Sequence, residues 1–598
     1  MLRPQDTARR DTRLLDGLWD FALDTDKQGR DAGWQAAIPE PRRMAVPGSW
    51  NDVFTTTQER EFFGDVWYQR RVKVPNGWTE QVLLYFESVT HTATVFVDGV
   101  EVAEHKGGYL PFEVDITQKV SPGGWFTLTV IANNQLSFET IPPGLVHQTS
   151  SGPKLHYWHD FFNYSGIHRH VWLASRPAIH VADITVFTSI DGDAGLIDYS
   201  VIVEGGEPGQ AGVRVALFDA AGAQVATAQG ESGQIEVADA RLWGVRDPHL
   251  YTLHVEVLSG GDVVDDYRQR VGIRSIEIAE GKLLLNGEPV YLTGFGMHED
   301  HPIVGKQHND TMMLRDFELL EWVGANSLRT SHYPYASEVM DYCDEQGVLV
   351  IDELPAVGQN FGLSSGIFGA GIALPTFSDQ TISTPTQYLH AQMIRELIDR
   401  DKNHPSVIIW SIANEPESGT EAAEAYFKPL WDVVRRADPT RPVGFVNVML
   451  EPHGKCRLHP YADLVMLNRY YGWYVNTGDL VAAEIDMREE LARWATEGKP
   501  IIMTEYGADT YPGEHTLPAA PWSEDYQVAY LEANCRAMDA TDLVIGEQMW
   551  NFADFATSSG IMRVGGNKKG AFTRDRQPKA AAHWLRRRWT SGMITKRG

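Results

Sequence analysis

Two glutamates in this sequence each follow a short apolar run at the point where the run ends. Residues 405–416 read PSVIIWSIANEP, with Glu415 directly after Asn414, and residues 500–507 read PIIMTEYG, with Glu505 after the run. A nearly unbroken apolar run is typical of a strand that is covered on both faces in a parallel sheet. One such glutamate would more often be solvated or cap a helix. Two of them predict paired acid and base chemistry.

Apolar runs of this kind alternate with amphipathic stretches over residues 275–598, and eight of them can be counted. Alternating strands and helices indicate βα units, and eight units predict a (β/α)8 TIM barrel. The active site of such a barrel lies at the carboxyl ends of its strands. Carboxylates, amides, imidazoles and aromatic rings occur at these predicted ends, in residues 298–301, 329–333, 352–353, 414–415, 447, 468–471, 505–506 and 550–551. A ring of such side chains suits a polyhydroxylated ligand, and we therefore expect a sugar.

Hydrolysis of a glycoside needs one protonated and one ionised carboxyl group. Glu415 and Glu505 are the favoured pair. Asp352 and Glu353 are rivals by position, although adjacent side chains on an extended chain point in opposite directions. Residues 298–301, HEDH, could be taken for a metal cluster, but they lack the HExxH spacing that places two ligands on one face of a helix. We expect hydrogen bonding there, and no metal or cofactor.

Two segments outside the strands could also contact a substrate. Residues 563–570, RVGGNKKG, follow the eighth strand and carry three cations in a chain of formal net charge −28. A charge run is often only solvated, but its place on the active face predicts recognition of an anionic group. Residues 358–386 have no clear period and contain several apolar side chains. We expect a loop over the active-site mouth that meets the leaving group or a neighbouring subunit, with a plain surface insertion as the alternative.

Short, β-branched and partly alternating runs fill the first part of the chain. They predict a β-sandwich of jelly-roll type over residues 1–180 and a smaller immunoglobulin-like sandwich over residues 181–274. Residues 156–164, HYWHDFFNY, do not alternate as a strand should, so we expect a loop that reaches another domain.

Composition narrows the classes of function. The net charge of −28 argues against nucleic acid and anionic membrane surfaces as partners. The three cysteines are far apart and form no CxxC pair, so a disulfide framework is not expected. The chain has no apolar run long enough for a membrane span, and its first residues lack the apolar segment of a secretory signal. A cytoplasmic location is the simplest expectation.

Taken together, these motifs resemble the β-glucuronidases of glycoside hydrolase family 2, nearly from end to end. The resemblance rests on HDFFNYSGIH at residues 159–168, GANSLRTSHYPY at 324–335, RDKNHPS at 400–406, SIANEP at 411–416, LNRYYGWY at 467–474, TEYG at 504–507, WNFADF at 550–555 and GGNKKGAFTRD at 565–575. It implies hydrolysis of small-molecule β-glucuronides by a homotetramer or dimer. It also implies retention through a covalent glycosyl-enzyme, for which the two carboxyl groups should be about 5 to 5.5 Å apart.

The resemblance also implies roles for single residues. Glu415 would be the general acid/base and Glu505 the nucleophile. Asn567 and Lys569 would recognise the glucuronate carboxylate, assisted by Arg563 and Tyr474. The ring and its hydroxyls would be held by Asp160, which enters from the first domain, and by His332, Asn414, Asn468, Tyr470 and Trp550.

These roles predict selectivity against neutral sugars, because a galactoside would leave the buried Lys569 cation unpaired. A family 2 β-galactosidase is the first alternative. A catalytically silent carbohydrate-binding protein is the second, and the intact glutamate pair argues against it. The sequence departs from the family chiefly in residues 358–386 and 444–450, so the preferred leaving group stays open.

Overall fold

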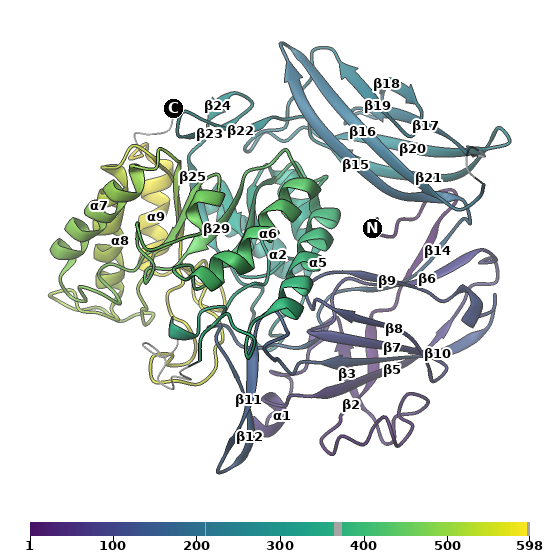
Figure 1. Ribbon diagram of the computed structural model, residues 1–598, viewed down its shortest axis with the longest axis horizontal. Helices are drawn as coiled ribbons and strands as arrows, with labels where there is room; N and C mark the ends of the chain where they lie inside the picture. Colours follow the sequence, from purple (N-terminus) through teal and green to yellow (C-terminus); the bar gives the residue numbers. More distant parts are fainter. Residues whose placement is uncertain (208, 210, 364–373, 595–598) are drawn as a thin grey trace.

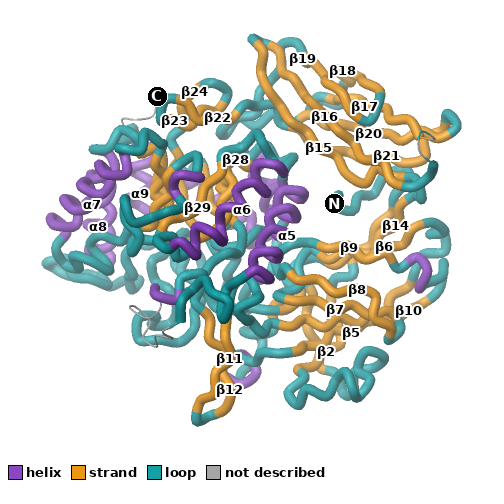
Figure 2. The backbone as a smooth tube through the Cα atoms, in the orientation of Figure 1, coloured by secondary structure: helices purple, strands orange, loops and turns teal. Residues whose placement is uncertain are grey.

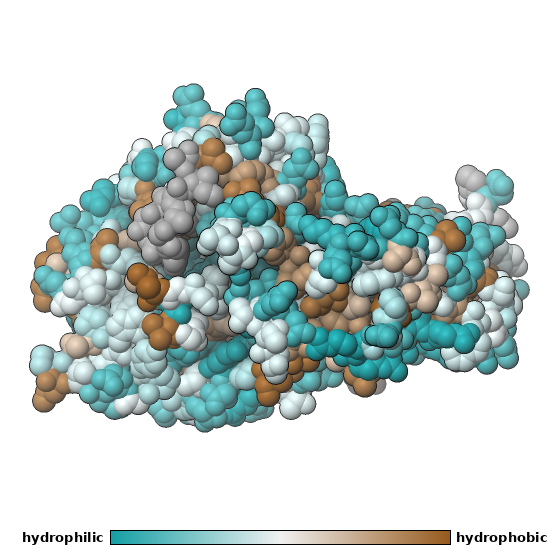
Figure 3. Space-filling view, turned by 90° about the horizontal axis from the view of Figure 1, so that it is seen from below, coloured by the Kyte–Doolittle hydropathy of each residue, from teal (hydrophilic) through white to brown (hydrophobic). Residues whose placement is uncertain are grey.

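The computed structural model describes all residues except 208, 210, 364–373 and 595–598. Two β-sandwiches lie on one side of the molecule, and a barrel surrounded by helices lies on the other (Figure 1). On the face seen in Figure 3, exposed apolar side chains are dispersed among hydrophilic ones. No helix in the described part of the chain is long and apolar enough to cross a membrane.

The first sandwich pairs a six-stranded antiparallel sheet with a four-stranded one, in the orders β3-β2-β5-β10-β7-β8 and β1-β14-β6-β9. Their strands are β1 (Asp11–Leu14), β2 (Gly17–Leu23), β3 (Arg42–Val46), β5 (Asp65–Lys73), β6 (Gln81–Phe86), β7 (Thr92–Val97), β8 (Val100–Lys106), β9 (Phe112–Asp115), β10 (Trp125–Asn133) and β14 (Val171–Arg176). Smaller elements are β4 (Gly48–Ser49), α1 (Thr57–Arg60), η1 (Thr117–Lys119), β11 (Gly144–Thr149), β12 (Gly152–Tyr157) and β13 (Gly166–Ile167). Alternate side chains of the two sheets form one buried core between them.

The second sandwich packs sheet β15-β16-β19 on sheet β18-β17-β20-β21. Its strands are β15 (His180–Asp191), β16 (Ala194–Glu204), β17 (Ala211–Phe218), β18 (Gln224–Gln229), β19 (Ser232–Val237), β20 (Tyr251–Ser259) and β21 (Asp262–Val271). The first ten residues of the chain also run along this sandwich. Leu2 packs against its core, and buried Arg10 donates to both oxygens of Asp265 at 2.9 and 2.6 Å.

Eight parallel strands close into a barrel. They are β25 (Leu292–Gly296), β26 (Ser327–Arg329), β27 (Leu349–Glu353), β28 (Val407–Asn414), β29 (Val443–Asn447), β30 (Val465–Asn468), β31 (Ile501–Glu505) and β32 (Val544–Met549). The surrounding helices are α2 (Asp310–Val323), α3 (Ser337–Gln346), α5 (Thr384–Asp401), α6 (Glu421–Ala437), α7 (Leu480–Ala495), α8 (Glu524–Asp539) and α9 (Ala580–Thr590), with η2 (His459–Tyr461) in a loop. A small sheet of β22 (Ile276–Ala279), β23 (Lys282–Leu285) and β24 (Glu288–Pro289) precedes the barrel. The predicted fold class, two sandwiches and a TIM barrel, is confirmed.

The apolar runs became barrel strands because both of their faces are covered. All eight residues of β28 are buried, and every residue of β31 is buried as well. Helix ends follow local signals, as in α2, where Asn309 accepts the Met312 N–H at the start and Gly324, at φ 86°, ends the helix in the left-handed region. The buried strands therefore fix the positions of the side chains at their carboxyl ends.

A loop from the first sandwich crosses to the barrel. The hairpin of β11 and β12 projects outward (Figure 2), beside α1 (Figure 1), and the chain after β12 continues into residues 158–164. There the Phe162 N–H donates to the carbonyl of Ala556 at 2.8 Å, and Phe161 pairs with Thr557. Residues separated by almost four hundred positions are thus held side by side at the barrel's active face.

Candidate active site

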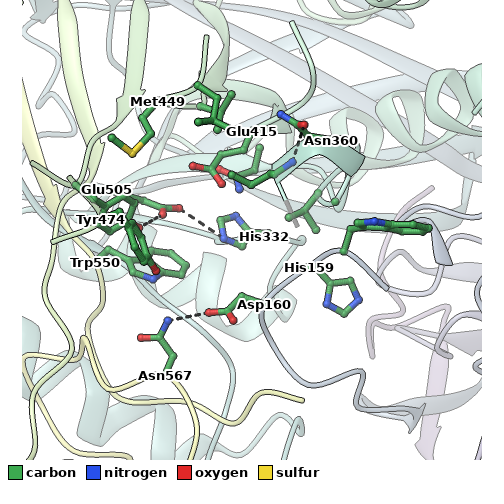
Figure 4. A pocket seen from close by; sticks show the side chains of 18 of the residues that line it. His159, Asp160, His332, Asn360, Glu415, Met449, Tyr474, Glu505, Trp550 and Asn567 are labelled. Atoms are coloured by element: carbon green, nitrogen blue, oxygen red, sulfur yellow. Dashed lines mark hydrogen bonds and ion pairs between the residues drawn. The ribbon is translucent and has the colours of Figure 1, made fainter. Parts of the chain in front are cut away.

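The barrel carries a cavity of about 620 Å³ that is lined by residues from many of its strand ends. Most of the predicted site residues line this cavity: Asp160, His332, Asn414, Glu415, Tyr470, Tyr474, Glu505, Trp550, Arg563 and Asn567. Asn468 and Lys569 lie behind the lining side chains, with 0% and 1% of their surfaces exposed. Figure 4 shows Glu415 and Glu505 turned toward the same space, with Asp160 and Asn567 across from them.

Glu415 follows β28 in a strained conformation. Its φ is 51°, in the left-handed region that favours glycine. The fold holds it there because its N–H donates to the carbonyl of Val446 at 2.9 Å and Pro416 prevents the strand from continuing. Burial, and then the negative charge of Glu505, raise the pKa of Glu415 to about 8, although a hydrogen bond from Asn468 opposes this. The group is therefore suited to donate a proton near neutral pH.

Glu505 ends β31 in a different environment. It is 4% exposed and accepts from Arg329 Nη2 at 2.5 Å and from the Tyr470 hydroxyl at 2.5 Å. His332 Nε2 lies 3.6 Å from the same carboxylate. A guanidinium and a phenol that both donate to Glu505 fix the direction of its carboxylate. The two glutamates thus have opposite electrostatic settings in one cavity.

The rival pair, Asp352 and Glu353, does not line the cavity. Glu353 accepts from Arg329 Nη1 at 3.0 and 2.9 Å and from Ser411 at 2.9 Å. Burial would raise the pKa of Glu353, but Arg329 together with His332 and Ser411 outweighs it and lowers the pKa. Asp352 points the other way, toward Thr330 at 3.0 Å. Burial, and next the charge of Asp401, raise the pKa of Asp352 well above its ordinary value. Glu353 therefore holds Arg329 in place, and Asp352 accepts a hydrogen bond from Thr330 away from the cavity.

Side chains beside the glutamates form the wall of the cavity. The His332 ring stacks on Trp550 with 5.0 Å between ring centroids, and His332 Nδ1 lies 2.8 Å from Glu353. Asn468 donates to the Asn414 side-chain oxygen at 3.3 Å and accepts from Thr504 at 2.9 Å. Asn468 therefore orients Asn414, while Asn414 itself reaches the cavity.

The residues predicted to bind an anionic group form one hydrogen-bonded cluster. Arg563 Nε donates to both oxygens of Asp160, at 2.7 and 3.0 Å, and Asn567 Nδ2 donates to Asp160 at 2.8 Å. The Tyr474 hydroxyl lies 3.1 Å from Arg563 Nη2 and 3.1 Å from Lys569 Nζ. Burial would raise the pKa of Asp160, but Arg563 and Asn567 outweigh it and lower the pKa. The loop from the first sandwich is thus tied to residues 563–569.

One expectation about this cluster is wrong. Lys569 is not an unpaired cation in the absence of substrate, because its Nζ forms an ion pair with Asp509. Asp509 is 1% exposed and also accepts the Lys568 N–H at 2.8 Å. The sequence reasoning missed Asp509, although it lies only four positions after Glu505 at the end of β31.

The histidines of residues 298–301 make hydrogen bonds outside the cavity. His298 Nδ1 lies 3.0 Å from the Tyr333 hydroxyl, and His301 Nε2 lies 3.2 Å from Arg576 Nη2. Burial lowers the pKa of both imidazoles, that of His301 to about 4. Among the described residues, neither histidine belongs to a group of three side chains spaced to hold a metal ion.

The outer part of the cavity is largely apolar. Its lining includes Leu363 from the loop of residues 358–386, Val448, Met449 and Leu450 from the segment 444–450, and Tyr471 from a predicted strand end. The lining residues that the sequence analysis did not assign are Val357, Val475, Asn476 and Asp486. Within residues 358–386, Gly358, Asn360 and Leu363 line the cavity, whereas residues 364–373 lie outside the described residues.

The fold and this site define a glycoside hydrolase. Models of glycosyl hydrolases family 2 match the chain in three successive parts: the sugar binding domain over residues 12–177, a further family 2 domain over 179–274 and the TIM barrel domain over 276–594. The chain belongs to glycoside hydrolase family 2.

Relatives within the family are similar over their full length. A β-glucuronidase of Paenibacillus borealis is 43% identical, with 98% of each chain covered, and that of Mus musculus is 40% identical, with 98% of this chain and 92% of the mouse chain covered. A Ruminococcus gnavus β-glucuronidase in complex with uronic isofagomine superposes with a TM-score of 0.95 at 42% identity, and its complex with D-glucuronic acid gives 0.92 at 41%. Both comparisons cover 98% of this chain and 99% of the other. The resemblance to the β-glucuronidases of this family is confirmed.

Proposed function

We propose that this protein is a retaining exo-β-glucuronidase, which hydrolyses β-D-glucuronides to D-glucuronate and an alcohol through a covalent glycosyl-enzyme. The observation that carries the proposal is the content of one cavity. Glu415 and Glu505 are turned toward the same space there, Glu415 with a raised pKa and Glu505 beside the Arg329 cation. Arg563 and Asn567 line the same cavity, and Asn567 lies across from the two glutamates. Full-length relatives that are β-glucuronidases support the same substrate class.

In the first step, Glu505 attacks the anomeric carbon while Glu415 donates its proton to the glycosidic oxygen. The bond from the carbon to that oxygen breaks, the alcohol leaves, and an ester bond joins the sugar to Glu505. Arg329 and Tyr470 hold the Glu505 carboxylate by hydrogen bonds and aim it before the attack.

In the second step, Glu415 acts as a base. Once Glu505 is esterified its negative charge is lost, and this charge is one of the causes that raise the pKa of Glu415. The pKa of Glu415 therefore falls, and its carboxylate takes a proton from a water that attacks the anomeric carbon. The ester bond breaks, which releases D-glucuronate with its original configuration and restores both glutamates.

Recognition of the sugar is divided between two sets of residues. Asn567, Lys569, Arg563 and Tyr474 are assigned to the glucuronate carboxylate, because they concentrate cations and donors in an otherwise acidic protein. The ring and its hydroxyls are assigned to Asp160, His332, Asn414, Asn468, Tyr470 and Trp550, with the Trp550 ring as an apolar face.

The test is a panel of p-nitrophenyl glycosides on the wild type, Lys569→Ala and Glu505→Gln. We expect the wild type to prefer the β-glucuronide over the β-galactoside, and Glu505→Gln to be inactive. Lys569→Ala should lose at least about tenfold in glucuronide kcat/KM, because a charged hydrogen bond is worth roughly 1.5 to 3 kcal/mol. The first product seen by proton NMR should be the β-anomer. Galactoside turnover above that of the glucuronide, or an α-anomer formed first, would refute the proposal.

We further propose that the enzyme works in the cytoplasm as a homo-oligomer, a tetramer or a dimer. All three cysteines are buried and free, which fits a reducing compartment. Light scattering of the purified protein and fractionation of the source cells would test the two statements separately.

A further inference from the structure

The anion-recognition cluster is already balanced in charge before any substrate arrives. Two cations, Arg563 and Lys569, face two carboxylates, Asp160 and Asp509. Arg563 Nη1 also lies 3.6 Å from Asp509 Oδ2, so the two ion pairs share one network. A glucuronate carboxylate that binds here is therefore a third anion beside two cations.

The two carboxylates of this network differ in their access to the cavity. Asp160 lines the cavity, its side chain is 26% exposed, and it belongs to a loop from another domain. Asp509 is 1% exposed, does not line the cavity and is fixed by the Lys568 N–H at 2.8 Å. Asp160 is placed where it can meet a sugar hydroxyl, whereas Asp509 touches only protein groups. Its effect on a substrate is transmitted chiefly through Lys569, its direct ion-pair partner, and to a smaller extent through Arg563 at 3.6 Å.

We propose that Asp509 is a positioning and affinity-setting residue, which holds the Lys569 ammonium toward the cavity and, by its own negative charge, limits how tightly the enzyme binds the glucuronate carboxylate. The inference rests on the proposed function. A fixed negative charge in contact with Lys569 lowers the positive potential that the substrate carboxylate meets. It also spares the free enzyme a buried unpaired cation. The product carries the same carboxylate as the substrate, so a weaker hold on this group favours product release.

Replacing Asp509 should strengthen the binding of D-glucuronate if Asp509 limits affinity, and weaken it if Asp509 only supports the local structure. In Asp509→Asn the Lys569 cation keeps its contact with the Tyr474 hydroxyl but loses its anionic partner, so D-glucuronate becomes the partner that neutralises it. We expect D-glucuronate to bind about tenfold more tightly to Asp509→Asn than to the wild type. A residue that only supported the local structure would weaken binding when it is replaced.

The experiment measures D-glucuronate binding by calorimetry, and its inhibition constant against p-nitrophenyl β-D-glucuronide, at neutral pH. Asp554→Asn is the matched control. Asp554 is 2% exposed, pairs with the buried Lys579 at 2.7 Å and accepts the Gly570 N–H at 3.0 Å, so the control breaks the same kind of pair outside the cavity. Both variants should have a lower Tm without ligand, but only Asp509→Asn should gain affinity and recover more Tm than the wild type on saturation with D-glucuronate.

A double-mutant cycle tests the route through Lys569. In a Lys569→Gln background, Asp509→Asn should give a much smaller gain in affinity, because only Arg563 at 3.6 Å is then left to respond. With Lys569 intact, Asp509→Glu keeps the charge and should bind D-glucuronate within about twofold of the wild type. If Asp509→Asn does not fold, Asp509→Ser carries the same prediction. If the wild type binds D-glucuronate and the folded Asp509→Asn and Asp509→Ser variants bind it equally or less well, the role of Asp509 is refuted and the proposed function still stands. A wild type that does not bind D-glucuronate would overturn the proposed function as well.

Discussion

The pH dependence of hydrolysis should report the pKa of Glu415, because this group has to carry a proton when the substrate arrives. Burial, and next the charge of Glu505, raise that pKa from an ordinary value of 4.5 to about 8. At pH 7 such a group is about nine-tenths protonated, whereas a group with the ordinary value would be protonated in about one molecule in 300. The environment of Glu415 therefore increases the competent population about 300-fold at neutral pH.

The assay is kcat/KM for p-nitrophenyl β-D-glucuronide across the range from acid to alkaline pH. Above a pKa of about 8 the value should fall about tenfold per pH unit, since the acid loses its proton. In Glu415→Gln, a substrate with a better leaving group, such as a 2,4-dinitrophenyl glucuronide, should retain a residual rate without this alkaline limb. The assignment of the acid would be refuted if kcat/KM of the wild type already fell above about pH 6, or if the alkaline fall persisted in Glu415→Gln.

Two further predictions follow from the same carboxylates. Between pH 4.5 and about 8 the folded chain keeps a proton on Glu415 that the unfolded chain releases, so this group's contribution to stability is lost as the pH rises through that window. Glu415→Gln should therefore raise the free energy of unfolding at pH 8 by roughly 4 kcal/mol in urea denaturation, since each unit of pKa difference is worth about 1.4 kcal/mol, and a gain that is no larger at pH 8 than at pH 4 would contradict this reasoning. Arg329→Lys should lose about tenfold or more in kcat and about 3 kcal/mol of stability, because one ammonium cannot replace the guanidinium that donates to both Glu353 and Glu505. Its control, Arg588→Lys, which disturbs a buried pair with Glu547, should lose stability but keep kcat.

The barrel could be predicted from the sequence because its strands are buried on both faces. An apolar run such as residues 407–412 has no other stable location in a large protein, and the end of the run marks where the side chain of Glu415 must emerge. The same logic placed Glu505. It could not distinguish Glu353 from a catalytic acid, since the partner that neutralises Glu353 is Arg329 on a neighbouring strand. That pairing is a property of the closed barrel.

The cluster around residues 563–569 shows a second limit. Its cations stand out in an acidic chain, so the sequence indicated an anion site. The carboxylates that balance them come from Asp160 in the first sandwich and Asp509 after β31, and a single aspartate in a loop has no pattern by which a partner sixty or four hundred positions away could be identified. The docking of the loop from the first sandwich, through Phe162 and Ala556, brings Asp160 to these cations, whereas Asp509 meets Lys569 within the barrel domain.

In the proposed function, the reacting groups are separate from the groups that select the substrate. Glu415 and Glu505 stand at the ends of two fully buried strands, and the Arg329 that holds Glu505 lies on a third. The selecting groups lie on loops, and their charges are balanced within the network of Asp160, Asp509, Arg563 and Lys569. Because Arg329 and its two carboxylates are complete without these loops, a substitution among residues 563–569 should change which sugar is held without altering how the bond is broken. The converse does not hold, since Glu505 shapes the pKa of Glu415 and neither glutamate can be replaced without disturbing the other.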